Sequence, residues 1–261
     1  MKKYELTDIT IEQTGITLYR IRAVRAIKAF GVKKGDLGGY VENEENLSQS
    51  DNAWVSGNAS VSGDASVSDN ASVSGNARIS GDASVYGNAS VSGNARISGD
   101  ASVYGNASVS GNASVSGDAW VSGNTWVSGD AWVSGNASVS GDARVSGNAS
   151  VSGDARVSGN AWVYGNASVS GDARVCGNAR VSGNARVCGD ADIIWCSKIG
   201  SRLDTTTAFI EKDGGVKIVC GCFCGMLNEF EKKVEETHGD NIYGKEYKAF
   251  IDLIKIHFGK V

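Results

Sequence analysis

The sequence has little of what most catalytic and membrane proteins depend on. There are only two histidines, His238 and His257, and neither lies in the long central repeat, so general acid–base chemistry has no histidine to use there. No apolar run is long enough to cross a bilayer, and residues 1–5 (MKKYE) lack the apolar core expected of a signal peptide. The net charge is only −4, which provides no basic footprint for nucleic acid. We therefore expect neither a membrane nor a nucleic acid as partner.

A six-residue unit occupies the chain from Asp51 to about Ile193. It reads Ala-x-Val-x-Gly-Asn/Asp without insertion or deletion, and its Val/Ile position recurs in steps of six from Val55 to Ile193, which makes twenty-four hexads. Ala-x-Val places two residues on the same side of a short strand, and Gly-Asn/Asp is the pair that best tolerates positive φ. Each hexad thus predicts one strand with valine inward and one corner. A disordered, solvated chain has no reason to keep its apolar residues at a fixed spacing. The strict six-residue spacing of valine and alanine therefore argues against disorder.

A longer period in the corner residue indicates three corners per turn. One corner carries aspartate every eighteen residues, with a single lapse at Asn136: Asp64, Asp82, Asp100, Asp118, Asp154, Asp172 and Asp190. Eighteen residues are three hexads, so we predict a triangular coil of about eight turns. We expect these carboxylates to accept local backbone hydrogen bonds. Cation binding between coils and imitation of nucleic acid are alternatives, which nearby arginines weaken.

Two sets of motifs resemble known families. The hexad at 139–144 (VSGDAR) resembles the repeat of left-handed β-helix proteins, the superfamily of bacterial hexapeptide acyltransferases. Residues 34–42 (KGDLGGYVE), 46–48 (NLS) and 52–55 (NAWV) are similar to the start of hexapeptide-repeat proteins common in phages and prophages. The tail, with 237–240 (THGD), looks like a small domain of other phage repeat proteins. These resemblances imply a left-handed coil, whereas the general crossover rule favours the right hand.

The predicted fold class is an all-β solenoid: a left-handed parallel β-helix with a small N-terminal β cap and a C-terminal α+β cap domain. The boundaries are 1–46 for the N-terminal cap, 47–203 for the β-helix and 204–261 for a hairpin followed by two helices. Val41 and Leu47 are six residues apart but Leu47 and Val55 are eight, which predicts a two-residue bulge in an irregular first coil. An open solenoid end exposes unpaired backbone, so a distinct cap is expected.

The outward residue between alanine and valine varies along the rod. It is mainly serine in the N-terminal half, whereas the C-terminal half carries the large side chains. Three tryptophans girdle about one turn, and two tryptophans alternate with two arginines at eighteen-residue spacing, which fits cation–π stacking. Self-stabilisation and a partner interface are both open interpretations. The predicted partner-binding residues are Trp120, Trp126, Trp132, Arg144, Trp162 and Arg180.

The six cysteines indicate a reduced, cytoplasmic setting, and the phage resemblance implies that this is the cytoplasm of a bacterial host. Cys176 and Cys188 are twelve residues apart and so lie on different faces. Cys220, Cys222 and Cys224 alternate along one expected strand. We expect buried free thiols rather than a zinc site, because Cys-x-Cys-x-Cys lacks the usual ligand spacing. No metal and no cofactor are predicted.

Three functions compete. Hexapeptide acyltransferases need a histidine base and an extruded loop, and the repeats contain neither, so we predict no enzyme and no catalytic residues. Ice or carbohydrate binding would favour threonine, and the repeats hold one, Thr125. We favour a non-catalytic homo-oligomeric rod of phage type. It presents the Trp/Arg surface to a host or phage protein, with counter-defence as one role, and holding a nucleotide or other small ligand between subunits is the alternative.

Overall fold

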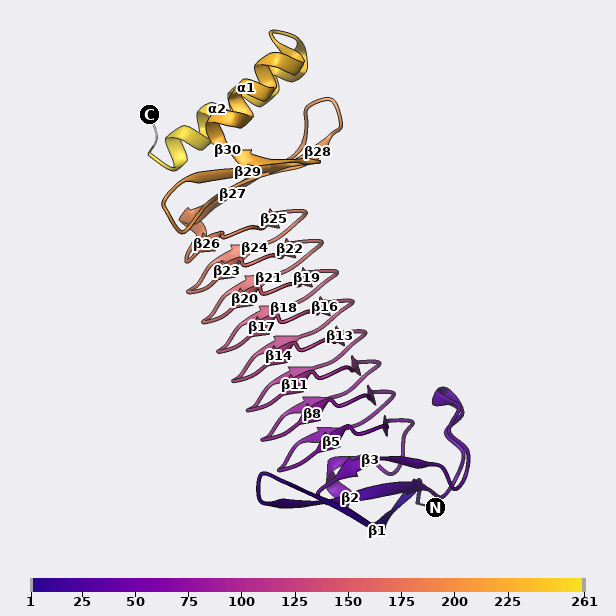
Figure 1. The fold of residues 1–261 in the computed structure, drawn as a ribbon. Helices are drawn as coiled ribbons and strands as arrows, with labels where there is room; N and C mark the ends of the chain where they lie inside the picture. Colours follow the sequence, from indigo (N-terminus) through magenta and orange to yellow (C-terminus); the bar gives the residue numbers. More distant parts are fainter. Residues whose placement is uncertain (1, 260–261) are drawn as a thin grey trace.

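The computed structural model describes residues 2–259 as a rod of stacked coils with a different unit at each end (Figure 1). Two-residue strands follow one another every six residues, from β4 (Trp54–Val55) to β26 (Arg186–Val187). A glycine with positive φ, such as Gly111 at +72°, turns the chain at the corner between them. The predicted unit of one strand and one corner per hexad is confirmed.

Strands that lie three hexads apart in the sequence pair side by side, which gives the coil its three faces. Val91 lies between Val73 and Val109 in parallel register, an offset of eighteen residues on each side. The fold is therefore a parallel β-solenoid of about eight coils, as the corner period predicts. Sheet 1 holds β5, β8, β11, β14, β17, β20, β23 and β26; sheet 2 holds β6, β9, β12, β15, β18, β21 and β24; sheet 3 holds β4, β7, β10, β13, β16, β19, β22 and β25.

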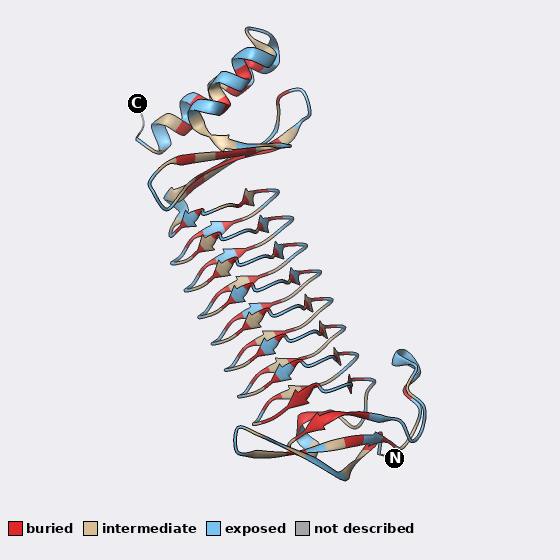
Figure 2. Ribbon diagram, viewed as in Figure 1, coloured by how far each residue is buried: buried red, intermediate tan, exposed pale blue. Residues whose placement is uncertain are grey.

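Buried residues recur in every coil of the rod (Figure 2), and they are the valines and alanines that stack in columns through its interior. Ala107 and Val109 are both fully buried, and the same holds for nearly every equivalent position along the rod. Each buried valine stabilises the fold by roughly 1.5–3 kcal/mol, which offsets the conformational entropy lost by its coil. Thr125 replaces alanine once, and its buried hydroxyl has no hydrogen-bond partner among the described residues.

Corner side chains form amide ladders along two edges of the rod. Asn94 Nδ2 donates to Asn112 Oδ1 at 2.9 Å, and Asn112 Nδ2 donates to Asp130 Oδ1 at 2.8 Å. Each ladder bond runs toward the residue eighteen positions later. An aspartate can accept such a bond but cannot donate the next, so Asp130 ends its run.

The expectation for the aspartate corner is wrong in the N-terminal half, although Asp190 at the C-terminal end accepts a backbone hydrogen bond from Arg174 N. Within residues 2–259, the carboxylates that stack at this corner in the N-terminal half accept no backbone hydrogen bond. The corner amide is used by the coil instead, since Asp82 N donates to Gly99 O at 3.0 Å. These side chains point to solvent and leave a column of like charges: Asp64, Asp82, Asp100 and Asp118.

The N-terminal cap continues sheet 1 beyond the first coil. β1 (Tyr4–Gln13) and β2 (Ile16–Ala23) form an antiparallel hairpin, β2 pairs with β3 (Leu37–Val41), and β3 pairs in parallel with β5 (Ser60–Val61). Short 3-10 turns lie at Lys28–Phe30 and Glu44–Asn46. Val41 pairs with Val61 and Leu47 bridges Val67, a shift of twenty residues instead of eighteen. The predicted two-residue bulge is confirmed.

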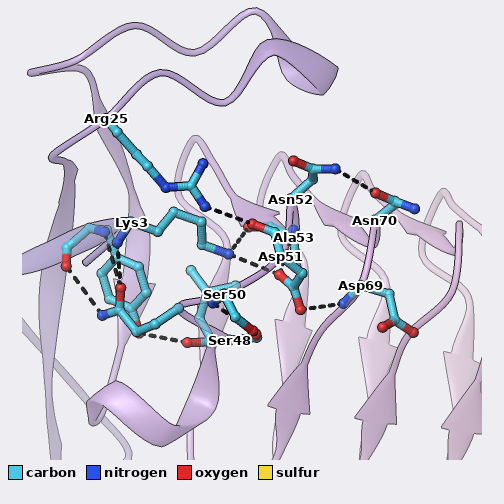
Figure 3. Close-up of polar contacts among 12 residues, drawn as sticks. Lys3, Arg25, Ser48, Ser50, Asp51, Asn52, Ala53, Asp69 and Asn70 are labelled. Carbon is cyan, nitrogen blue, oxygen red and sulfur yellow. Dashed lines mark hydrogen bonds and ion pairs between the residues drawn. The ribbon is translucent and has the colours of Figure 1, made fainter. Parts of the chain in front are cut away.

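Lys3 closes the first coil from inside the cap (Figure 3). Its fully buried ammonium group donates to Ala53 O at 2.7 Å and Asp51 Oδ1 at 3.1 Å. Burial lowers the pKa of Lys3 despite this carboxylate. Burial alone would raise the pKa of Asp51, but hydrogen bonds from Ser48, the amides of Ala53 and Asp69, and Lys3 together hold that pKa below its usual value.

The C-terminal cap begins earlier than the six-residue spacing suggests. Ile193 and Ile199, assigned to the solenoid by that spacing, instead lie in β27 (Ile193–Ile199) of an antiparallel sheet with β28 (Asp204–Ile210). The regular corner glycine is missing, because Trp195 stands two residues after Ile193. Tryptophan adopts the positive φ of this corner far less readily than glycine, or than Asp69, which turns its own coil at φ +63°. A 3-10 turn at Asp190–Asp192 leads into the new sheet.

The remaining cap elements occur in the predicted order. β28 and β29 (Val216–Cys220) form the expected hairpin, and β30 (Phe223–Met226) adds a fourth strand. Helices α1 (Leu227–His238) and α2 (Ile242–His257) cover one face of this sheet, and Gly239 is the C-cap of α1 (Figure 1). No helix in the described part of the chain is both long and apolar enough to span a bilayer.

Polar side chains from the C-terminal cap satisfy the last coil. In the solenoid each strand amide donates to the next coil, so the final coil has donors without a successor. Arg174 N donates to Asp190 Oδ1 at 2.8 Å, Arg180 N to Thr207 Oγ1 at 3.0 Å and Cys188 N to Asp192 Oδ2 at 2.7 Å. Both ends of the rod are therefore closed by hydrogen bonds that replace a missing coil.

Candidate functional site

The six predicted binding residues lie on outward positions of the solenoid but do not form one patch. Trp126, Arg144, Trp162 and Arg180 occupy successive strands of sheet 3: β16 (Trp126–Val127), β19 (Arg144–Val145), β22 (Trp162–Val163) and β25 (Arg180–Val181). Trp120 is in β15 (Trp120–Val121) of sheet 2, and Trp132 is in β17 (Trp132–Val133) of sheet 1. We call the four residues of sheet 3 the Trp/Arg ladder. The other two tryptophans face different directions.

The ladder residues stack in the order that the eighteen-residue spacing predicts. The Arg144 guanidinium carbon lies 5.3 Å from the Trp126 ring centroid and 4.8 Å from that of Trp162. The Arg180 guanidinium carbon lies 5.4 Å from the Trp162 ring centroid, on the side of the ring away from Arg144. Parallel pairing of the four strands imposes this order, because it places each outward side chain beside the one eighteen residues away.

The ladder remains open to solvent in spite of its internal contacts. Trp126 is 56% exposed and Trp162 is 37% exposed. Neither arginine forms a salt bridge within residues 2–259, so aromatic faces are the guanidinium contacts that the structure describes. The ladder thus combines flat apolar surface with two positive charges, the side chains most often found at binding hot spots.

The C-terminal end of the ladder borders a hollow that the repeat pattern does not predict. Trp162 and Arg180 line a cavity of about 350 Å³ together with Lys198, Leu203 and Asp204 from the C-terminal cap. Lys198 and Leu203 both have positive φ, so a tight turn presents them here. Sequence reasoning missed these residues because the repeat is lost after Ile193 and gives no register for the C-terminal cap.

A second aromatic column runs along the edge of sheet 2. Tyr86 and Tyr104, which are eighteen residues apart, stack in parallel with ring centroids 4.9 Å apart. Trp120 then meets Tyr104 edge to face at 6.5 Å. Trp120 therefore belongs to this tyrosine column and not to the ladder, although it is as exposed as Trp126.

The cysteine prediction is wrong in two respects. Cys220 ends β29, Cys222 lies in the following turn and Cys224 lies in β30, so the three do not share one strand. The free thiols are also exposed or half-buried instead of buried. Cys220 Sγ accepts from Thr206 Oγ1 at 3.1 Å, and Cys224 lies near Ser182 Oγ at 4.0 Å. Within residues 2–259 no group of three His, Cys, Asp or Glu side chains is placed to hold a metal ion.

Cys220 and Cys222 instead line a cavity of about 280 Å³ inside the C-terminal cap. Its lining includes the aromatic rings of Phe223 and Tyr247 and the basic side chains of Arg202 and Lys233. Burial raises the pKa of the Tyr247 hydroxyl, whose oxygen accepts from the Cys220 thiol at 3.7 Å. This cavity lies within one chain and is not part of the ladder.

Comparison with known families agrees with the repeat geometry. A family model described as YdcK Beta solenoid repeat matches residues 77–93, 95–111, 149–165, 155–171 and 173–189. Each match spans seventeen residues, just under one coil, so the chain is similar to this family across both halves of the solenoid. The tryptophan girdle and Arg144 lie outside the matched stretches. No curated protein matches the chain.

Proposed function

We propose that this β-solenoid is a non-catalytic binding protein that presents the Trp/Arg ladder to a protein partner. The supporting observation is the placement of Arg144 between two exposed indole rings, with no carboxylate paired to it among the described residues. Such an arginine is held in place before binding, so less side-chain entropy is lost when a partner docks. The matching surface on the partner carries carboxylates beside apolar side chains.

The strands of sheet 3 do not need the ladder side chains in order to pair. In the N-terminal half of sheet 3 the same column holds Ser72, Ser90 and Ser108, and their strands pair in the same register. Tryptophan and arginine at these positions therefore serve something other than strand pairing. A partner interface accounts for their exposure.

The absence of chemistry in the repeats supports a role in binding. The two histidines lie at the ends of α1 and α2, away from sheet 3, and the repeats carry no histidine or lysine. The phage resemblance of the entry motif makes a host protein the partner to test first, and inhibition of a defence component is the role we propose for that encounter.

Native mass spectrometry and affinity capture from bacterial lysate test this proposal together. The wild type should retain a protein that a Trp126→Ser/Trp162→Ser variant loses, while circular dichroism shows the same fold. Trp120→Ser/Trp132→Ser is the matched control, since it removes two exposed tryptophans from other faces, and it should retain the partner. Equal capture by both variants would exclude the ladder as interface. An added mass of nucleotide size would instead support ligand sequestration.

A further inference from the structure

Helix α2 (Ile242–His257) has an apolar outer face besides the one that it buries. Tyr247, Phe250, Ile251 and Ile254 pack inward against the cap. On the opposite side Ile242 is 65%, Leu253 48% and Ile256 66% exposed. Large aliphatic side chains are otherwise rarely this exposed in the described residues, so the outer face needs an explanation of its own.

The outer face has the spacing of a helix–helix seam. Ile242, Ala249 and Ile256 are seven residues apart, and Leu253 lies four after Ala249, which is the alternation of threes and fours found in coiled coils. Ala249 is exposed and stands midway between the two isoleucines. The isoleucines thus lie at equal distances on either side of a small residue, as a surface that pairs with an antiparallel copy of itself requires.

The charges of α2 divide between the two faces in the same way. Lys248 bonds Glu235 at 2.8 Å and Asp240 at 2.9 Å, and Lys255 bonds Glu231 at 2.5 Å, so both hold α1 and the loop that joins the helices. Lys245 and Asp252 have no salt bridge within residues 2–259. They lie seven residues apart on one flank of the apolar stripe, with opposite charges.

We infer that a second copy of this chain covers this face, with the two α2 helices antiparallel about a two-fold axis near Ala249. Ile242 then packs on Ile256 of the partner subunit, and the small Ala249 lets the helices approach closely. The same axis places Lys245 opposite Asp252 of the partner subunit. Because the axis is two-fold, the interface contains this pair of opposite charges twice. This inference stands apart from the proposed ladder interface, which is on the solenoid.

The area available to one helix stripe is below that of a standard stable interface, so the dimer should dissociate on dilution. Joining two chains through their caps would nevertheless give each particle two ladders. A partner with two binding surfaces would then be held more tightly than by one chain alone.

Sedimentation velocity of the full chain over a concentration series tests the inference. The expected result is a shift with concentration from 27.1 kDa toward about twice that mass. Ile256→Glu should abolish the shift without changing the circular dichroism spectrum, because this side chain is exposed. A mass that stays at one chain up to about 1 mM, or a dimer that Ile256→Glu leaves intact, would overturn it.

A charge exchange tests the antiparallel orientation. Lys245→Asp places two pairs of like charges across the axis and should weaken the dimer at least several-fold at low salt. The double variant Lys245→Asp/Asp252→Lys restores opposite charges and should recover wild-type dimerisation. Failure of the double variant to recover, when Lys245→Asp alone weakens the dimer, would contradict the proposed axis.

Discussion

The two halves of the solenoid share one backbone and one interior but differ in their outward residues. In sheet 3 the N-terminal half carries Ser72, Ser90 and Ser108 after a buried Trp54, and the C-terminal half carries the exposed Trp/Arg ladder. Strand length, register and burial of the valine column are the same in both halves. The comparison shows that the outward position is free to vary while the inward one is not, so the fold leaves that position available for function.

The sharpest test of this difference between inward and outward positions lies in the serine half. Val109→Asp would bury a carboxylate without a partner and should cost at least about 4 kcal/mol or prevent folding. Ser108→Asp, one residue earlier and facing solvent, should change stability by less than about 0.5 kcal/mol. Thermal melting compares them, and equal losses would mean that valine does not face inward.

The serine half also depends on the polar contacts that close its first coil. Asp51→Asn should lower stability at neutral pH by about 1–2 kcal/mol, because the hydrogen bond from the buried Lys3 ammonium loses its charged acceptor. Since the pKa of Asp51 is held low in the folded protein, its contribution is complete above about pH 5. It is lost as the pH falls below about 4.

The difference between wild type and Asp51→Asn in urea unfolding should therefore narrow as the pH falls from 5 toward 2. The matched control is Asp64→Asn, at an exposed corner without side-chain hydrogen bonds in the described structure. It should show no comparable dependence on pH. If the difference in free energy of unfolding between wild type and Asp51→Asn stayed constant with pH, the charge of Asp51 would not contribute and the side chain would act by its shape alone.

Thr125 lies where the serine half passes into the tryptophan girdle. Thr125→Ala restores the repeat and removes a buried hydroxyl that has no partner among the described residues, so it should stabilise the protein by about 1 kcal/mol. The reverse change at the next hexad, Ala131→Thr, should destabilise by a similar amount or more. A loss of stability in Thr125→Ala would mean that the side chain's packing outweighs its unpaired hydroxyl.

Removal of the ladder itself should have only a modest effect on stability. Each exposed cation–π contact contributes about 0.5–1 kcal/mol, so Arg144→Ser should cost no more than about 2 kcal/mol, since Arg144 makes two such contacts. Arg156→Ser, on sheet 2, is the control and should cost less. A much larger loss in Arg144→Ser would favour a structural role for the ladder over an interface.

The repeat could be predicted from the sequence in detail, whereas the caps could be predicted only in outline. Valine and glycine recur at fixed positions because each coil presents the same environment as the one before it, so strand, corner, register and ladder are all consequences of the spacing. The tail has no such period. Its hairpin and helices could be located, but not the turn at Cys222 that separates the cysteines or the strand pairing that removes Ile193 from the solenoid.

By itself, the sequence determined the solenoid, its three faces, the inward valines and the stacking of Arg144 between two tryptophans. Each of these features depends on contacts between residues eighteen positions apart in the sequence, and three six-residue repeats fix that separation. Only the tertiary structure decided that Trp120 meets Tyr104 edge to face, that Lys198 and Leu203 lie beside the end of the ladder, and that α2 leaves Ile256 uncovered. Those outcomes depend on how unlike elements pack, for which a local pattern supplies no register.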